Sequence, residues 1–435
     1  MEQTVVRNTL IDATRFPVSS RALVSRAGPV QAAARAAVLG KLARLAEGEI
    51  RFVDGREART IGRRTGDFDL CAEVVVRDPA MWPLVALGGT VGAAEAYIEG
   101  MWDVDDLTTL VRIFARNREL VDGMETGFAR LAAPLHKAYH LLRDNTRSGA
   151  KKNIVAHYDL GNEFYKLFLD PTLTYSAGIF EREDSTMEEA SLAKIDRLCE
   201  KLDLRPEHHL LEVGTGWGAF AIRAARTRGC RVTTTTISRE QHRLALERVR
   251  AAGLADRIEV LEQDYRDLRG SYDRIVSVEM IEAVGHPYYE EYFRALGRLL
   301  KPDGSCAIQA ITIQDQQYDQ AARSVDFIQR YVFPGSTIPS VTRILGAATK
   351  SSDLKLTHLE DMTPHYATTL RLWRERFHEN LPAVRALGQS EAFTRLWTYY
   401  LCYCEGGFAE RAIGSVQLLF AKPRNRREPI LPRLA

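Results

Sequence analysis

Alternating glycines separate an apolar run from a helical pattern at residues 210–218. This segment reads Leu-Leu-Glu-Val-Gly-Thr-Gly-Trp-Gly, with Gly214, Gly216 and Gly218 at every second position. Glycine lets backbone N–H groups approach a ligand where a side chain would block it, and the start of a helix attracts nucleotide-like ligands. The spacing differs from the G-x-G-x-x-G of dinucleotide-binding proteins, and similar turns also join strands to helices without any ligand. The segment therefore predicts a strand, a turn and a helix, with a cofactor site as one of two alternatives.

Polar side chains follow the next two predicted strands. Residues 235–238 read Thr-Thr-Ile-Ser and are followed by Gln241, where a dinucleotide fold places an acidic residue to bind ribose hydroxyls. NAD is therefore disfavoured, although hydroxyl and amide groups can bind the same hydroxyls and a threonine run is also typical of any strand. Asp264 and Tyr265 follow the third strand, where an acid beside an aromatic ring suits an adenine. An Asx turn is the alternative for Asp264.

The elements that must position these residues alternate regularly in the second half of the chain. Strand-like segments separated by helical patterns predict βαβ units and a parallel sheet, hence an α/β fold. Residues 314–412 form a helical, aromatic-rich insert, which predicts either a wall over an apolar substrate or ordinary core packing. The expected strands are residues 209–213, 230–237, 257–261, 273–278, 305–313 and 413–420.

The first third of the chain has a different pattern. Residues 1–145 predict a small α+β domain with strands at Glu49–Val53 and Leu70–Arg77 and a helix at Val91–Glu99. The polar segment 144–149 breaks the periodicity and predicts the boundary to a second domain at residues 146–435.

Composition and charge restrict the partners. At 435 residues, with 45% hydrophobic and 27% charged residues, the chain is expected to form two or three globular domains. It has no apolar run long enough for a bilayer and no secretory signal, and its six cysteines form no C-x-x-C pair, which favours the cytoplasm and no metal site. The net charge of +2 hides a basic start: residues 1–64 hold twelve Lys/Arg against six Asp/Glu. This favours lipid head groups or nucleic acid as partner, with a solvated basic face as the alternative.

Together with further segments, these motifs resemble one family of class I methyltransferases, the cyclopropane fatty acid synthases. The resemblance is continuous over about residues 151–423 and extends weakly to Trp102. It implies a Rossmann-like seven-stranded sheet, a substrate-covering helical insert at 314–412 and a small N-terminal α+β domain. The further segments are His157-Tyr158-Asp159 with Gly161-Asn162, Leu173-Thr174-Tyr175-Ser176, residues 276–282, residues 331–335, residues 366–370 and Tyr399-Tyr400-Leu401.

The resemblance also implies S-adenosylmethionine as cofactor. Its methyl group would be transferred to the double bond of an unsaturated phospholipid acyl chain, which leaves a carbocation on that chain. Such a site must exclude water and offer aromatic faces or negative charge to the cation. The residues at cofactor-binding positions of the family are Tyr175, Ser176, Glu212, Gly214, Gly216, Trp217, Gly218, Thr236, Ile237, Ser238, Gln241, Asp264 and Tyr265.

In the family, a bound bicarbonate takes a proton from the transferred methyl group so that a cyclopropane closes. Glu282, Tyr366 and the backbone of Ile311 match three of its ligands. Ala177 stands in place of the usual cysteine and Gln309 in place of the usual histidine; both can still donate a hydrogen bond, but Gln309 cannot relay a proton. Bicarbonate binding therefore stays open. So does the choice between a cyclopropane and a methyl or methylene branch formed after a hydride shift, with Glu282 as base in the second case.

Two candidate catalytic residues have simpler alternatives. Glu282 could form an ordinary ion pair at a strand end. Cys404 matches a cysteine sometimes marked as active in the family, but the mechanism needs no thiol nucleophile, and free cysteines often serve as small buried apolar residues.

The implied partners are unsaturated phospholipids, met by a cytoplasmic protein at the inner membrane face. No nucleic acid is expected, because base-stacking modules are absent; the first domain is assigned to lipid contact or dimerisation, and a methylene product would need a downstream reductase. A methyltransferase with another substrate and a non-catalytic lipid-binding homologue stay open. The basic residues that alternate with apolar ones, as on membrane-bound helices, are Arg21, Arg26, Arg35, Lys41, Arg44, Lys151 and Lys152.

Overall fold

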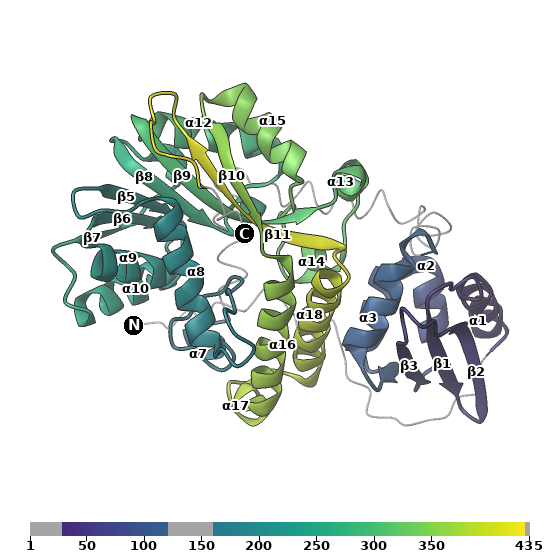
Figure 1. Ribbon diagram of the computed structural model, residues 1–435. Coiled ribbons are helices and arrows are strands. Elements are labelled where there is room, and N and C mark those ends of the chain that lie inside the picture. Colours follow the sequence, from purple (N-terminus) through teal and green to yellow (C-terminus); the bar gives the residue numbers. More distant parts are fainter. Residues whose placement is uncertain (1–27, 121–159, 431–435) are drawn as a thin grey trace. The chain divides into compact units, whose positions relative to one another are not determined.

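The computed structural model describes residues 28–120 and 160–430 (Figure 1). Its chain divides into two compact units, which we call the N-terminal unit and the sheet unit and describe separately. The N-terminal unit comprises Met1–Leu142, Arg323–Pro334 and Trp373–Ala412. The sheet unit comprises Arg143–Ala322, Gly335–Leu372 and Ile413–Ala435.

Seven strands form the central sheet of the sheet unit, in the order β10-β11-β9-β8-β5-β6-β7. The β5–β6, β6–β7, β5–β8 and β8–β9 pairs are parallel, whereas β11 runs antiparallel to β9 and to β10. This confirms the predicted parallel α/β arrangement and its six expected strands. The strand bounds are β5 His209–Val213, β6 Arg231–Thr236, β7 Ile258–Glu262, β8 Tyr272–Val278, β9 Leu300–Ile313, β10 Lys355–Asp361 and β11 Ile413–Ala421.

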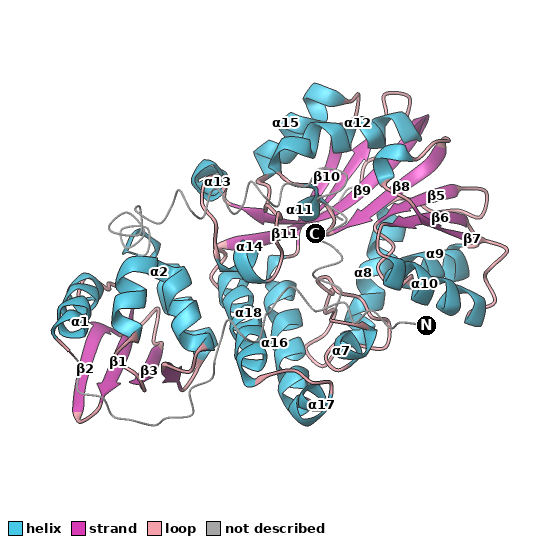
Figure 2. Cartoon of the chain, turned by 180° about the vertical axis from the view of Figure 1, so that it is seen from behind, coloured by secondary structure: helices cyan, strands magenta, loops and turns pink. Residues whose placement is uncertain are grey.

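Helices cover both faces of this sheet because side chains alternate between them along each strand. Figure 2 shows α9 and α10 on one side and α12 and α15 on the other. Leu198 of α8, Phe220 and Val249 belong to the core on the first face, and Leu296 and Ile344 to the core on the second. The bounds of the helices of this unit are α7 Asn162–Lys166, α8 Met187–Lys201, α9 Ala219–Arg228, α10 Arg239–Ala251, α11 Ile281–Val284, α12 Tyr289–Leu299, α13 Asp315–Ala321, α15 Val341–Ser351 and α16 Thr363–Glu379. The part of α16 from Trp373 onward belongs to the N-terminal unit.

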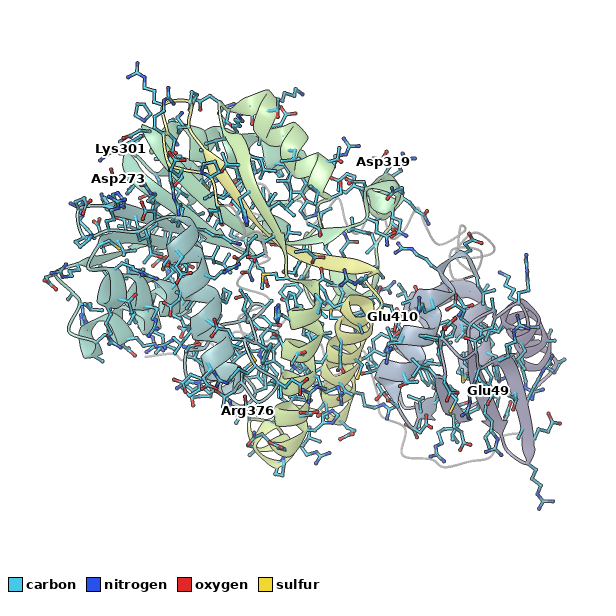
Figure 3. The ribbon with its side chains drawn as sticks, viewed as in Figure 1. Glu49, Asp273, Lys301, Asp319, Arg376 and Glu410 are labelled. Carbon is cyan, nitrogen blue, oxygen red and sulfur yellow. The ribbon has the colours of Figure 1, made fainter. Side chains whose placement is uncertain are left out.

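The two edges of the parallel sheet differ. At the amino-terminal edge, Lys301 pairs with Asp273 at 2.6 Å (Figure 3), and Asp273 also accepts a hydrogen bond from the His209 backbone N–H at 2.9 Å. The loops that follow β5, β6, β7 and β8 all lie at the carboxyl edge. Ligands of such folds bind at this edge, at the point where the strand order reverses. Here that point is β5, which has β6 on one side and β8 on the other.

A four-stranded sheet, in the order β2-β1-β3-β4, is the centre of the N-terminal unit. Strands β1 and β3 confirm the two predicted strands, whereas β2 and β4 were not predicted. Gly89, at φ 57° and ψ −134°, interrupts the helical geometry of α2. The bounds are α1 Pro29–Leu42, β1 Gly48–Asp54, β2 Glu57–Arg63, β3 Cys71–Val76, α2 Met81–Ile98, β4 Trp102–Val104, α3 Leu107–Arg116, α14 Phe327–Tyr331, α17 Leu381–Ala386 and α18 Glu391–Ala409.

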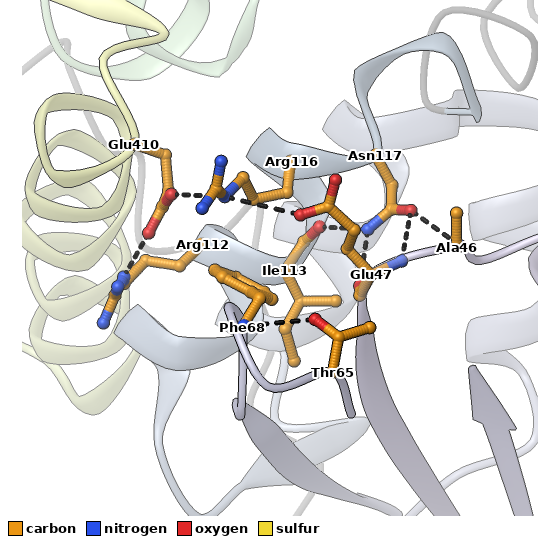
Figure 4. A network of polar contacts seen from close by, with 9 residues as sticks. All are labelled: Ala46, Glu47, Thr65, Phe68, Arg112, Ile113, Arg116, Asn117 and Glu410. Atoms are coloured by element: carbon orange, nitrogen blue, oxygen red, sulfur yellow. Dashed lines mark hydrogen bonds and ion pairs between the residues drawn. The ribbon is translucent and has the colours of Figure 1, made fainter. Parts of the chain in front are cut away.

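Ion pairs join α3 to the end of α18 within the N-terminal unit (Figure 4). Glu410 accepts a hydrogen bond from Arg112 at 2.6 Å and forms an ion pair with Arg116 at 2.9 Å. Beside them, the Asn117 side-chain amide donates a hydrogen bond to the Glu47 backbone carbonyl at 2.7 Å. These contacts explain why part of the predicted insert groups with the N-terminal residues and not with the large sheet.

The insert at 314–412 is more varied than its aromatic content predicts. It contains β10, an edge strand whose charged residues hid it from the sequence pattern. Its rings largely pack against one another: Phe327 lies 4.7 Å from Tyr399 and Trp397 lies 5.1 Å from Tyr400, between ring centroids. For these rings the structure supports the core-packing alternative over a substrate wall. No helix in the described ranges combines the length and apolarity needed to cross a bilayer.

Candidate active site

The glycine turn connects β5 to α9 at the carboxyl edge of the sheet. Gly214, Gly216 and Gly218 all have positive φ (104°, 51° and 86°), a conformation in which other residues are strained. The amides of Gly214 and Thr215 donate to the Thr235 carbonyl on β6 at 3.1 and 3.0 Å, which fixes the turn against the neighbouring strand. A Cβ at Gly216 would meet no atom within 4 Å. Open space therefore adjoins the turn, as a bound cofactor requires.

Side chains after β6 form a small hydrogen-bonded group at the same edge. The Thr236 hydroxyl donates to Gln241 Oε1 at 2.8 Å, and Ser238 caps α10 by accepting from the Gln241 N–H at 3.4 Å. Ile237 between them is half-buried. The predicted residues are thus held together where β6 ends, and Ile237 offers an apolar surface beside them.

The residues after β7 show the Asx turn that the sequence left as an alternative. Asp264 accepts from the Arg266 backbone N–H at 3.0 Å and pairs with its guanidinium at 2.7 Å. Tyr265 packs edge-on against Tyr292, with ring centroids 5.6 Å apart. The Asp264 carboxylate therefore already has a cationic partner, and its contact with a cofactor stays a prediction.

Buried charges lie behind the turn. Glu212 on β5 accepts from the Thr234 hydroxyl at 2.6 Å, and burial raises the pKa of its carboxyl to about 8. Lys194 of α8, which belongs to none of the sequence motifs, donates to the Ser176 hydroxyl at 2.7 Å, and burial lowers the pKa of its ammonium to about 8. Lys194 thus fixes one of the predicted cofactor-binding residues, Ser176, from inside the core.

Aromatic rings complete this side of the site. Tyr175 and Trp217 both contact Tyr165, at centroid distances of 5.4 and 5.0 Å, and the Trp217 ring N–H donates to Asn162 at 2.7 Å. The segment containing Tyr175 and the glycine turn are therefore brought together through α7, as the sequence predicts for a shared site.

Glu279 gathers three of the residues that the sequence assigned to a bound anion. Its Oε1 accepts from the Ala177 N–H at 3.1 Å and from Gln309 Nε2 at 2.8 Å, and its Oε2 accepts from the Tyr366 hydroxyl at 2.6 Å. Burial raises the pKa of the Glu279 carboxyl, and the hydrogen bonds from Tyr366 and Gln309, with the charge of Lys194, oppose that rise. Three donors on one carboxylate favour its ionised form.

The backbone at Glu279 is strained. Its φ is 48°, in the left-handed region that suits glycine and costs other residues on the order of 1–2 kcal/mol. Such strain persists only where the surroundings hold the residue in place, and it concentrates at functional sites. Here the strained backbone directs a carboxylate onto three donors.

Glu282 lies one helical turn further, in α11. Its Oε1 accepts from the Ile311 backbone N–H at 2.5 Å, while its buried Oε2 has no hydrogen-bond partner among the described residues. Burial, and then repulsion from Glu279, raise the pKa of the Glu282 carboxyl to about 8. The residue is only 9% exposed and forms no ion pair within the described ranges, so the alternative of an ordinary ion pair at a strand end does not hold. Glu282 is thus shielded from bulk solvent, as carbocation chemistry requires.

The bicarbonate that the family resemblance implies does not fit this arrangement. The Ala177 N–H, the Gln309 amide and the Tyr366 hydroxyl already donate to Glu279, and the Ile311 N–H donates to Glu282. An added anion would find these donors occupied and would face two carboxyl groups.

The remaining predicted residues lie elsewhere. Cys404 belongs to α18 of the N-terminal unit, and burial raises the pKa of its thiol well above the usual range, which disfavours a nucleophilic thiolate. Among the basic residues proposed for membrane contact, Arg35 pairs with Asp54 and Glu57, both at 3.0 Å. Outside the described residues lie Arg21, Arg26, Lys151, Lys152, the polar boundary at 144–149 and the His157-Tyr158-Asp159 motif.

Comparison with known proteins identifies the family. The sequence profile of the family described as mycolic acid cyclopropane synthetase matches residues 145–418. The chain belongs to this family. The tuberculostearic acid methyltransferase UfaA1 of Mycobacterium tuberculosis is 36% identical over 417 residues, which cover 94% of this chain and 95% of that protein. The cyclopropane-fatty-acyl-phospholipid synthase of Escherichia coli K12 is 34% identical, over 81% of this chain and 88% of its own length.

Solved structures agree. The mycolic acid cyclopropane synthase CmaA1, complexed with SAH and CTAB, superposes with a TM-score of 0.59 at 34% identity, covering 62% of this chain and 98% of its own. This family member therefore has the class I methyltransferase fold and is an S-adenosylmethionine-dependent methyltransferase acting on double bonds of lipid acyl chains. The open glycine turn fits that cofactor.

Gly216→Ala is expected to weaken binding of S-adenosylmethionine at least tenfold, measured by calorimetry, because the methyl group enters the open space beside the turn. Gly253→Ala is the matched control: its φ of 68° is similarly left-handed and its Cβ also meets nothing within 4 Å, but it follows α10 away from the turn. Both variants should lose about 1 kcal/mol of stability. Equal cofactor affinity in the two would remove Gly216 from the site.

Proposed function

We propose that this enzyme methylates the double bond of an unsaturated phospholipid acyl chain to give a methylene branch, with Glu279 as a built-in anion and Glu282 as base. The observation that carries the proposal is the convergence of Ala177, Gln309 and Tyr366 on the Glu279 carboxylate. A carboxylate of the chain thereby takes the donors that the family resemblance assigns to bicarbonate.

S-adenosylmethionine, when bound, supplies a methyl group on a positively charged sulfur. The acyl chain gains this CH3 at one alkene carbon and is left with a cation at the other. Glu279 is suited to stabilise that cation, because its charge is fixed in a buried site and needs no reorganisation. Its lone pairs are engaged by three donors, so it is a weak proton acceptor.

Glu282 is the better proton acceptor. Its Oε2 has no partner among the described residues, and a pKa of about 8 allows it both to take and to release a proton near neutral pH. The two carboxyl groups differ in their hydrogen bonds, since Glu279 is engaged by three donors and one oxygen of Glu282 by none, and carboxyl pairs in unlike surroundings typically divide such roles.

The proposed product follows from the replacement of bicarbonate, the ring-closing base that the family resemblance implies, by Glu279. A hydride moves from the methylated carbon to the neighbouring cation, and the new cation then loses a proton from the methyl group to Glu282. The acyl chain has then gained one CH2 and keeps one C=C bond, as an exocyclic methylene. The match over 94% of the chain to a relative named as a tuberculostearic acid methyltransferase, and not as a cyclopropane synthase, supports this choice.

A membrane-surface substrate is part of the proposal. The relative named for fatty-acyl phospholipids and the basic residues of the first 64 positions support it. A downstream reductase, a homodimer and lipid contact by the N-terminal unit are consistent with this function and remain proposals.

Fatty acids from cells expressing this chain and fed methyl-labelled methionine test the product. We expect a gain of one labelled CH2 with the alkene retained, seen as uptake of hydrogen under mild catalytic hydrogenation and as exocyclic methylene protons in NMR spectra. Purified enzyme with vesicles of unsaturated phospholipid should show the same gain, and saturated vesicles are the control. A saturated ring would overturn the proposed product, and no gain at all would favour the non-catalytic alternative.

A further inference from the structure

A row of polar side chains crosses the sheet on the face that α8 covers. Glu360 on β10 is the direct cross-strand partner of Gln417 on β11, which is the partner of Gln309 on β9. Gln309 in turn is paired with Val278 on β8, the residue before Glu279. The row therefore leads across four adjacent strands to the proposed anion.

Hydrogen bonds connect this row. Lys201 at the end of α8 donates from Nζ to Gln417 Oε1 at 2.7 Å, and Gln417 Nε2 donates to Gln309 Oε1 at 2.9 Å. Gln309 Nε2 then donates to Glu279 Oε1 at 2.8 Å. Lys201 is 3% exposed and both glutamines are fully buried, so water does not compete for these bonds.

The direction of the chain of hydrogen bonds is set at its Lys201 end. A glutamine amide can present either its oxygen or its nitrogen to a neighbour, whereas an ammonium group only donates. Because Lys201 donates, Gln417 must turn its oxygen toward Lys201 and its nitrogen toward Gln309. Gln309 must then accept with its oxygen and direct its own nitrogen at the active site.

Stability alone does not explain these glutamines. Lys201 has an ion-pair partner in Glu360 at 2.6 Å, which accounts for its burial without them. Two fully buried amides in a sheet core are costly relative to apolar residues of similar volume. Their polarity does have a consequence at Glu279, where the wrong amide orientation would place oxygen against a carboxylate.

We infer that Lys201 and Gln417 are positioning residues that orient the Gln309 amide as a hydrogen-bond donor to Glu279. The inference deepens the proposed function and rests on the role of Glu279 in it. Neither residue touches the reacting groups; both act through Gln309.

Gln417→Glu reverses the direction of the hydrogen bonds with almost no change in shape. A carboxylate beside Lys201 stays ionised and only accepts, so the Gln309 amide must turn its nitrogen toward it and its oxygen toward Glu279. We expect kcat to fall about tenfold, with the KM for S-adenosylmethionine within twofold of wild type.

Glu360→Gln is the control, since it removes the ion pair of Lys201 but keeps an oxygen for it and leaves the glutamine row intact; its kcat should stay within twofold. Gln309→Leu combined with Gln417→Glu should be no slower than Gln309→Leu alone, because Gln417 acts through Gln309. If Gln417→Glu fails to fold, Lys201→Met tests the same step without adding a charge.

The inference is overturned if Gln417→Glu keeps wild-type kcat, or if the losses in the double variant multiply as for independent sites. Failure of the proposed function is seen separately, as wild-type turnover in Glu279→Gln. Loss in Glu279→Gln together with wild-type behaviour of Gln417→Glu overturns this inference alone.

Discussion

Glu279→Gln is expected to lower kcat about 100-fold or more while the affinity for S-adenosylmethionine stays within twofold of wild type. The substitution keeps the shape of the side chain and removes the fixed negative charge beside the cation. Loss of a preorganised electrostatic group typically lowers kcat by about this factor. It also turns an amide NH2 toward groups that donate, Ala177 or Tyr366, and so leaves a donor unpaired. Single-turnover kinetics and calorimetric cofactor titration separate these effects. Wild-type kcat would remove Glu279 from the reaction.

Glu279→Gly provides the complementary experiment. Glycine adopts the φ of 48° without strain, so this variant should fold, and it frees the donors of Ala177, Gln309 and Tyr366. We expect its turnover to depend on added bicarbonate, with cyclopropane among the products, whereas wild-type turnover is unchanged in carbonate-free buffer. A wild-type enzyme that loses activity without carbonate would contradict the proposed replacement.

The sequence predicted the central sheet well, for a physical reason. Central strands such as β5 and β8 each contain a short apolar pair, Leu210-Leu211 and Ile275-Val276, between helical patterns, which marks them as strands of a buried sheet. Edge strands lack this signal: β10 alternates exposed and half-buried residues, and β2 is largely exposed. The aromatic rings of the insert could not be assigned from the sequence either, because aromatic content is the same whether the rings pack against one another or line a substrate site.

The active site was predicted in part. The glycine turn and the polar residues after β6 are local in sequence, and their positions follow from the parallel sheet. The role of Glu279 depends on contacts with residues 102 positions earlier and 30 and 87 positions later, which only the fold brings together. Ala177 and Gln309 therefore looked like lost bicarbonate ligands, whereas in the structure they complement a carboxylate. Two glutamates three residues apart after a strand were the signal that could have identified it.

Glu282→Gln is expected to lower kcat about 100-fold or more and to abolish one limb of the pH profile. In the wild type, kcat/KM reports groups of the free enzyme, so it should rise with pH to a plateau above about pH 8, where Glu282 becomes ionised and can accept the proton. Glutamine cannot accept it at any pH. A Glu282→Gln enzyme that keeps both turnover and the limb near pH 8 would show that another group is the base.

The same pKa makes an independent prediction for stability. The pKa of Glu282 is about 8 in the folded protein against an ordinary value of 4.5, so between these values the unfolded chain carries the charge and the folded protein binds the extra proton. Stability contributed by the neutral form is present below pH 4.5 and is lost as the pH rises through 8. Glu282→Gln does not titrate, so its melting temperature should fall less than that of the wild type between pH 5 and pH 8. If the melting temperatures of the two proteins fall equally over that range, Glu282 is not a buried neutral acid. Its proposed role as a base that titrates near neutral pH would then be wrong.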